Sequence, residues 1–95
     1  MPAPSISMTW PQYLRSECTV DGKVYHLCGQ EREILFMLLL HRRVANEDMI
    51  EHLWPDADKQ PLTPLWIFRK IKCQLNQRLG PVIRNCYGFG MELIT

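Results

Sequence analysis

A run of basic and hydrogen-bonding residues between Pro61 and Gly80 is the part of this sequence best suited to bind another molecule. If the run is helical, one stripe of it carries no acidic residue and consists of Trp66, Arg69, Lys70, Cys73, Asn76 and Gln77. Arginine and lysine donate hydrogen bonds to guanine O6 and N7 and to phosphate oxygens. The stripe is therefore suited to the major groove of DNA, although a helix that is merely exposed to water would show the same amphipathic pattern.

The sequence predicts that this run forms one helix from Pro64 to Leu79. Thr63 is a favourable N-cap, and Pro64 occupies the first helical position, where a missing N–H has no cost. Gly80 follows the last periodic residue, and the proline after it cannot continue the helix. The stripe opposite the basic one is apolar and is expected to lie in the core; it consists of Pro64, Phe68, Ile71, Leu75 and Leu79.

The charge of the chain is strongly divided, although its net value is only +1. Residues 1–58 hold five Lys or Arg and nine Asp or Glu, which gives a net charge of −4. Residues 59–91 hold six Lys or Arg and no acidic residue, which gives a net charge of +6. A positive field on one side of a protein favours a polyanion such as DNA, because binding releases condensed counterions from the phosphates.

Two shorter helices are predicted before the long one. The first extends from Glu31 to Arg43, because its residues are mostly apolar and its two terminal arginines suit the C-terminal dipole. The second begins with Asn46 as N-cap, carries acidic residues in its first turn and ends before Pro55. The loop that follows, residues 55–61, is longer than the turn of a minimal helix-turn-helix.

Two β-hairpins are predicted on either side of the helices. Residues 19–27 place β-forming residues around Asp21-Gly22, a dipeptide that tolerates two positive φ values. Residues 82–94 form two β-rich runs around a turn with two glycines. We expect residues 1–18 to form an N-terminal arm or short strand, and residues 19–95 to form one domain.

The cysteines and histidines show no spacing typical of a metal site or a catalytic centre. The four cysteines (Cys18, Cys28, Cys73 and Cys86) contain no C-x-x-C pair, and the three histidines lie at no zinc-finger spacing. We therefore expect free thiols, no metal, no cofactor and no enzymatic activity. The longest apolar run has seven residues, against about 20 for a membrane span, and no signal peptide opens the chain, so a cytoplasmic protein is expected.

Taken in order, these elements resemble the DNA-binding effector domain of OmpR/PhoB-type response regulators, here without an attached receiver domain. The similarity covers roughly residues 20–94 and rests on four segments: the acid-containing helix start at 27–35, the second helix ending in Trp54, the basic run at 69–75, and the glycine-flanked aromatic at 88–91. The resemblance implies an α+β winged helix-turn-helix, with three helices, an N-terminal β-hairpin and a C-terminal β-hairpin wing.

On this resemblance the long helix is the recognition helix. The candidate DNA-contacting residues are Thr63, Trp66, Arg69, Lys70, Lys72, Cys73, Gln77, Arg84 and Tyr87. Arg69 and Lys70 are expected to contact a base edge and a phosphate, whereas Lys72 and Arg84 contribute phosphate contacts. Trp66 is compatible with three roles, namely contact with thymine methyl groups, packing on the wing, or insertion into a partner protein. Tyr87 stands where the family usually carries an arginine.

The expected function is sequence-specific binding to duplex DNA by a small bacterial or phage transcriptional regulator. One helix and one wing cover few bases, so a homodimer or a tandem pair on DNA is expected. The alternative is a winged helix converted to a protein-interaction module that docks on RNA polymerase or another regulator. The apolar residues Leu65, Trp66 and Ile67 favour this alternative, and the loop 55–61 is the expected contact with polymerase.

Overall fold

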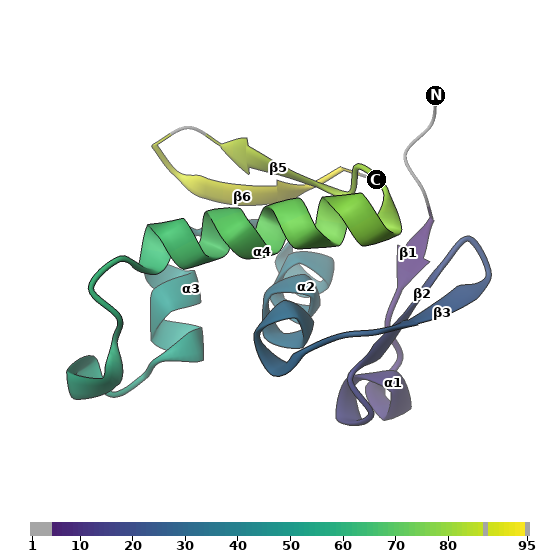
Figure 1. The fold of residues 1–95 in the computed structure, drawn as a ribbon, viewed down its shortest axis with the longest axis horizontal. Helices are drawn as coiled ribbons and strands as arrows, with labels where there is room; N and C mark the ends of the chain where they lie inside the picture. Colours follow the sequence, from purple (N-terminus) through teal and green to yellow (C-terminus); the bar gives the residue numbers. More distant parts are fainter. Residues whose placement is uncertain (1–4, 87, 95) are drawn as a thin grey trace.

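The computed structural model describes residues 5–86 and 88–94 (Figure 1). Its helices are α1 (Trp10–Leu14), α2 (Gly29–His41), α3 (Asn46–Leu53) and α4 (Pro64–Leu79), with a 3-10 turn, η1, at Ala57–Lys59. Its strands are β1 (Ile6–Ser7), β2 (Glu17–Val20), β3 (Lys23–His26), β4 (Arg43–Ala45), β5 (Ile83–Cys86) and β6 (Gly90–Leu93).

The strands form two antiparallel sheets, one from the first three strands and one that joins β4, in the middle of the sequence, to the C-terminal hairpin. The N-terminal sheet has the order β1-β2-β3, and the other has the order β4-β6-β5. Figure 1 shows α4 extending along the molecule between the β5–β6 hairpin and the body formed by α2 and α3. Contacts of α4 with both α2 and β5 fix this position.

The three predicted helices and both predicted hairpins are confirmed. The turn between β2 and β3 uses Asp21 at φ 50° and Gly22 at φ 85°, as an Asp-Gly hairpin requires. Helix α4 begins after its N-cap Thr63 with Pro64 and ends at Gly80, which has φ 93°. The α+β class and the winged-helix arrangement of the elements are therefore confirmed.

The prediction that the first helix continues to Arg43 is wrong. Helix α2 ends at His41, because Arg42 adopts φ 61° and turns the chain out of the helix. Arg43 then begins β4, where Val44 pairs with Met91 of β6 and is buried. Pairing with β6 leaves Ala45, not Asn46, as the N-cap of α3.

The first 18 residues contain more regular structure than an arm or short strand. Helix α1 begins at Thr9, whose hydroxyl accepts a hydrogen bond from the Gln12 N–H at 3.3 Å, while the Gln12 side chain accepts one from the Thr9 N–H at 2.9 Å. This capping box stabilises a helix of five residues. Strand β1 pairs with β2 through Ile6 and Val20, so this segment is part of the N-terminal sheet.

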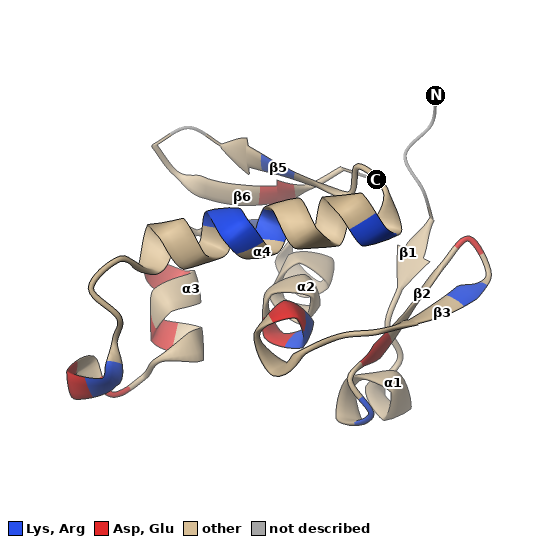
Figure 2. Cartoon of the chain, in the orientation of Figure 1, with Lys and Arg blue, Asp and Glu red and all other residues tan. Residues whose placement is uncertain are grey.

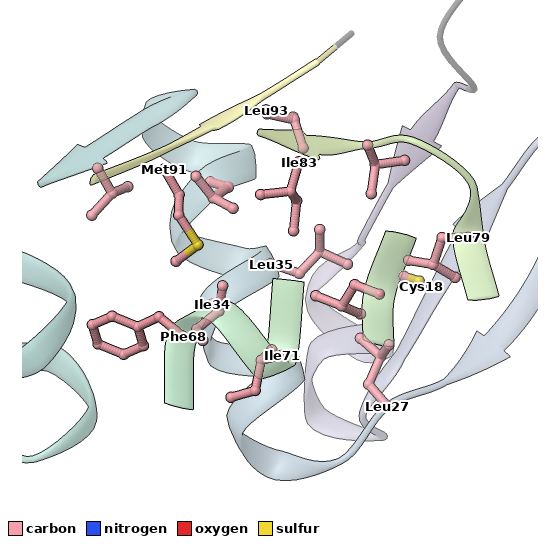
Figure 3. Close-up of a cluster of buried hydrophobic side chains, with 14 of the residues drawn as sticks. Cys18, Leu27, Ile34, Leu35, Phe68, Ile71, Leu79, Ile83, Met91 and Leu93 are labelled. Carbon is pink, nitrogen blue, oxygen red and sulfur yellow. The ribbon is translucent and has the colours of Figure 1, made fainter. Parts of the chain in front are cut away.

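The core lies where α4, α2 and the β5–β6 hairpin meet (Figure 3). The apolar stripe of α4 is buried through Phe68, Ile71, Leu75 and Leu79, and Pro64 is only half-buried. This stripe packs against α2 and against the start of the β5–β6 hairpin. The fully buried residues there are Ile34, Leu35 and Leu38 of α2, and Val82 and Ile83 at the hairpin. Trp54 also contributes to the core, as its ring stacks on Phe68 with centroids 5.8 Å apart. The predicted division of α4 into an apolar and a polar face is confirmed.

Gly90 allows the hairpin to join β4. A Cβ atom at this position would lie 2.0 Å from the backbone oxygen of Val44 and 3.0 Å from the Cα of Ala45. Both are backbone atoms of a paired strand and cannot move aside without breaking the sheet. The close approach between β6 and β4 therefore requires glycine at this position.

Gly90→Ala should lower the free energy of unfolding by about 2 kcal/mol or more, because the added methyl group overpacks against backbone. For a domain of this size the loss corresponds to a decrease in Tm of roughly 10 °C, measurable by circular dichroism. Gly29→Ala is the matched control, since a Cβ at Gly29 meets nothing within 4 Å. A Gly90→Ala protein as stable as the control would contradict the close packing of the two strands.

Candidate nucleic-acid interface

The solvent-exposed face of α4 carries a group of cations that are not neutralised within the protein. Arg69 and Lys70 are exposed and Lys72 is half-buried at the edge of this face. Within the described part of the chain none of the three forms an ion pair with an acidic residue. Figure 2 shows basic residues along the middle of α4 and no acidic residue on that helix, whereas acidic residues lie on other elements, among them α2, α3 and β6. This face therefore concentrates positive charge where a polyanion has open access.

A shallow hollow on this face brings together four of the residues predicted to contact DNA. It is lined by Trp66, Arg69, Lys70 and Cys73. Gln77 lies one further turn along the same exposed face. The predicted spacing thus placed these five side chains on one continuous surface of the helix, with an aromatic ring at its N-terminal end and two cations in its middle.

A second hollow separates α4 from the wing, the β5–β6 hairpin. Arg69 lines it from the helix, and Asn85, Cys86 and Gly88 are among its lining residues on the hairpin. Arg69 thus borders both hollows, whereas Lys70 borders only the first. Among the cations of α4, the Arg69 guanidinium is therefore best placed to contact a ligand that lies between α4 and the wing.

Two other basic residues of the range 59–91, Arg78 and Arg84, form ion pairs with acidic residues of the protein. The Arg78 guanidinium lies 3.1 Å from Glu31 Oε1, and it also donates to the backbone oxygen of His26. Glu31 is buried and accepts a hydrogen bond from the Cys28 N–H at 2.9 Å. Because Glu31 lies at the start of α2, its ion pair with Arg78 connects the end of α4 to the start of α2. Arg78 thus has a structural role.

Arg84 is paired across the wing. Its Nε donates to Glu92 Oε1 at 2.8 Å, and a second guanidinium nitrogen contacts the same oxygen. Arg43 of β4 approaches the other carboxylate oxygen at 3.8 Å, so Glu92 lies between two arginines in one row of the sheet. The hydrogen bond from Arg84, aided by the charge of both arginines, lowers the pKa of Glu92 below its ordinary value.

Sequence reasoning missed the part that Arg43 and Glu92 play in the wing. The sequence places Arg43 at the end of the predicted first helix and indicates no role for Glu92. The Arg43 guanidinium also lies over the Phe89 ring, 4.4 Å from its centroid. The Arg-Val-Ala segment at residues 43–45, after an apolar helix, is only a weak signal for a strand. The pairing of this segment with β6 is what places Arg43 and Arg84 on either side of Glu92.

The remaining predicted residues have different surroundings. Thr63 is exposed and caps α4 without a side-chain hydrogen bond. Asn76, which the helical stripe placed on the exposed face, is half-buried and ties α4 to the wing: its Oδ1 accepts from the Val82 and Ile83 N–H groups at 3.1 and 3.0 Å. Tyr87 lies outside the described residues.

A second exposed surface lies at the N-terminal end of α4 and is apolar. Leu62 is fully exposed, Leu65 is 54% exposed and Trp66 is 66% exposed. These residues border a hollow whose other walls include Ile50 and Glu47 of α3. Ile67, which the sequence grouped with Leu65 and Trp66, is half-buried and packs on the core instead. An apolar patch next to acidic residues has the character of a protein-binding surface.

The cysteines are free and lie in different environments. Cys18 is fully buried, and burial raises the pKa of its thiol to about 11, whereas Cys28 and Cys73 are exposed. In the described part of the chain no three His, Cys, Asp or Glu side chains come together as metal ligands would. The helices of that same part are all too short or too polar to cross a membrane.

The lowered pKa of Glu92 predicts a pH-dependent contribution to stability. Because the folded pKa lies below the unfolded one, the stabilisation is present above the unfolded value of 4.5 and is lost as the pH falls through the folded value. Glu92→Gln should lower Tm near pH 7, and its difference from wild type should shrink between about pH 6 and pH 3.

Thermal melts at stepped pH measure this difference. Glu51→Gln is the control, because Glu51 is an exposed carboxylate on α3 that forms no ion pair with any described residue. A Glu92→Gln difference that stays constant down to pH 3, about one unit or more below the ordinary carboxylate value, would contradict the pairing with Arg84.

Comparison with known proteins supports the assignment of the fold. No family model matches the sequence. A relative, the uncharacterized transcriptional regulatory protein YbdJ of Bacillus subtilis (strain 168), is 34% identical over 67 residues, which are 68% of this chain but only 30% of that protein. The chain thus matches less than a third of the length of this relative.

Two solved structures share the fold over nearly the whole chain. The C-terminal domain of the nisin resistance regulator NsrR, a lantibiotic response regulator, superposes with a TM-score of 0.67 at 21% identity, covering 93% of this chain and 89% of that one. The DNA-binding domain of response regulator AdeR, solved in complex with an intercistronic region, gives a TM-score of 0.66 at 15% identity, covering 93% and 92%. The chain has the winged helix-turn-helix fold of the DNA-binding domains of OmpR-type response regulators.

Proposed function

We propose that this chain binds duplex DNA in a sequence-specific manner and regulates transcription, with α4 in the major groove and the β5–β6 wing on the flanking backbone or in the minor groove. The observation that carries the proposal is the exposed face of α4, on which Arg69, Lys70 and Lys72 are free of acidic partners among the described residues. The similarity in fold to the AdeR DNA-binding domain, solved in complex with an intercistronic region, supports binding to DNA.

The distribution of charge supports binding mainly through the exposed face of α4. Arg78 is paired with Glu31, and Arg84 shares Glu92 with Arg43, so the cations of residues 59–91 that have no acidic partner among the described residues lie mainly on α4. Phosphates attract such a face from any DNA sequence, and bidentate contacts to base edges then supply discrimination. Arg69 and Lys70 are suited to guanine, and Lys72 and Thr63 to the backbone.

The size of the face supports binding by two copies. From Trp66 to Gln77 the helix advances about 17 Å, at about 1.5 Å per residue, which corresponds to roughly five base pairs. A single site of this length occurs too often in a genome to specify a promoter. We therefore propose a homodimer or a tandem pair on adjacent half-sites spaced by one helical turn.

Variants of the exposed cations test the proposal. Arg69→Ala or Lys70→Ala should weaken binding to the preferred duplex by about 1–3 kcal/mol if that residue reads a base, and should relax the preference at one position. Lys72→Ala and Arg84→Ala should weaken binding to all sequences alike and lower the salt slope by about one phosphate contact each. Fluorescence anisotropy with labelled duplexes over a range of salt concentrations measures both quantities.

Lys23→Ala is the matched control, because Lys23 is an exposed cation on the N-terminal hairpin, away from α4. Its removal should leave affinity and salt slope nearly unchanged. If the wild-type chain shows no duplex affinity beyond non-specific levels at about 50 mM salt, the DNA-binding proposal fails. Equal losses for Lys23→Ala and Lys70→Ala would show that only the net charge of the chain matters.

A second candidate function is supported by the apolar hollow beside α3. Leu62 is fully exposed and lies next to the exposed residues Leu65 and Trp66. Contact with water or phosphate does not stabilise an apolar patch of this kind, whereas contact with an apolar protein surface does. Glu47 lines the same hollow, and Asp56 and Asp58 lie in the adjoining loop 55–61. This surface suits a protein partner with apolar and basic residues, such as a subunit of RNA polymerase or another regulator.

Leu62→Ser separates the two functions. It should reduce binding to purified RNA polymerase several-fold in a surface plasmon resonance assay, because the apolar contact is lost, while duplex affinity stays within a factor of about two. The fold should be unaffected, since Leu62 makes no buried contact. Unchanged polymerase binding by Leu62→Ser, or absence of binding by the wild type, would remove polymerase from consideration.

A further inference from the structure

We infer that the hollow lined by Trp66, Arg69, Lys70 and Cys73 receives the 5-methyl group of a thymine, and that Trp66 is a specificity-determining residue of this chain. The inference rests on the proposed binding of α4 in the major groove. It adds a chemical identity for part of the target: an A·T pair, oriented with its thymine toward Trp66, next to a G·C pair read by Arg69 or Lys70.

Trp66 is available for such a contact because the fold does not use it. Its side chain is 66% exposed, and the aromatic contact in the core is made by Trp54 and Phe68 instead. The indole lies in the first turn of α4, the end of the helix that leads into loop 55–61. Large aromatic rings bury extensive apolar area on binding, so an unused tryptophan on the face with the free cations indicates a ligand with an apolar group.

The charges around the hollow identify the kind of ligand. Arg69 and Lys70 lie on its rim and no acidic residue lines it. The neighbouring hollow at Leu62 also touches Trp66 but has Glu47 in its wall. A polyanion is thus favoured in the first hollow and disfavoured in the second. The major groove of DNA offers one apolar group, the thymine 5-methyl, and the indole ring and the Cys73 side chain are the apolar groups of the hollow available to contact it.

The spacing along the helix fixes the neighbouring base. Arg69 and Lys70 follow Trp66 by three and four residues, which is an advance of about 4.5–6 Å along the axis. This distance corresponds to one or two base steps of about 3.4 Å. The thymine that faces Trp66 should therefore lie one or two base pairs from the guanine that accepts hydrogen bonds from Arg69 or Lys70.

The experiment begins by selecting binding sites from a pool of random duplexes with the wild-type chain. We expect an enriched site that contains thymine one or two base pairs from guanine. In that duplex each thymine is then replaced in turn by deoxyuridine, which removes only the methyl group and keeps the base pair. Replacement of the thymine that faces Trp66, one in each half-site, should weaken binding about fourfold, the factor for burial of one methyl group, and the other replacements should have little effect.

The Trp66→Ala variant assigns the contact. It should bind the thymine and deoxyuridine duplexes equally, because the partner of the methyl group is gone, while remaining folded since Trp66 is exposed. Leu62→Ala is the matched control: it removes an exposed apolar side chain from the adjacent hollow and should keep the fourfold preference for thymine.

The outcomes separate this inference from the proposed function. If no duplex is enriched, sequence-specific binding fails and the inference fails with it. If a duplex is enriched but no thymine is sensitive to deoxyuridine, α4 still binds DNA and the thymine contact is overturned. If Trp66→Ala keeps the fourfold preference, the methyl group acts through another residue or through DNA shape, and the assignment to Trp66 is overturned.

Discussion

The structure depends on the packing of one face of helix α4 against the core, which leaves the opposite face exposed to solvent. Its apolar stripe is buried against α2 and the start of the wing through Phe68, Ile71, Leu75 and Leu79. Polar contacts then fix the C-terminal half: Asn76 binds the backbone of Val82 and Ile83, and Arg78 binds the buried Glu31. Because these contacts lie on the core side of α4, the cations of the opposite face remain accessible to a ligand.

The wing is fixed by a different kind of contact. Gly90 lets β6 approach β4 more closely than any side chain would permit, so the hairpin is joined to the helices through the segment after α2. Glu92 then lies between Arg43 and Arg84 across the three strands. This row stabilises the sheet and engages both wing arginines with one carboxylate, whereas Arg69, Lys70 and Lys72 of α4 form no ion pair with any described residue. A phosphate that engages Arg84 has to compete with Glu92 for it.

The two hollows that share Trp66 differ in the charge of their walls. The one bordered by Arg69 and Lys70 is cationic, and the one bordered by Leu62 and Leu65 includes Glu47. The first hollow therefore complements a polyanion, and the second complements an apolar or basic protein surface. The proposed DNA contact and the alternative protein contact thus involve two adjoining surfaces at the N-terminal half of α4.

The sequence by itself determined the elements whose signals are local. The proline and glycine at the ends of α4, the Asp-Gly turn and the 3.6-residue period predicted the long helix, the first hairpin and the exposed position of Trp66, Arg69 and Lys70. Only the tertiary structure decided which charges are free, since the pairing of Arg78 with Glu31 joins residues 47 positions apart. Strand β4 was missed for the same reason: three residues after a helix have little intrinsic preference, and their extended conformation comes from pairing with β6, which lies far along the chain.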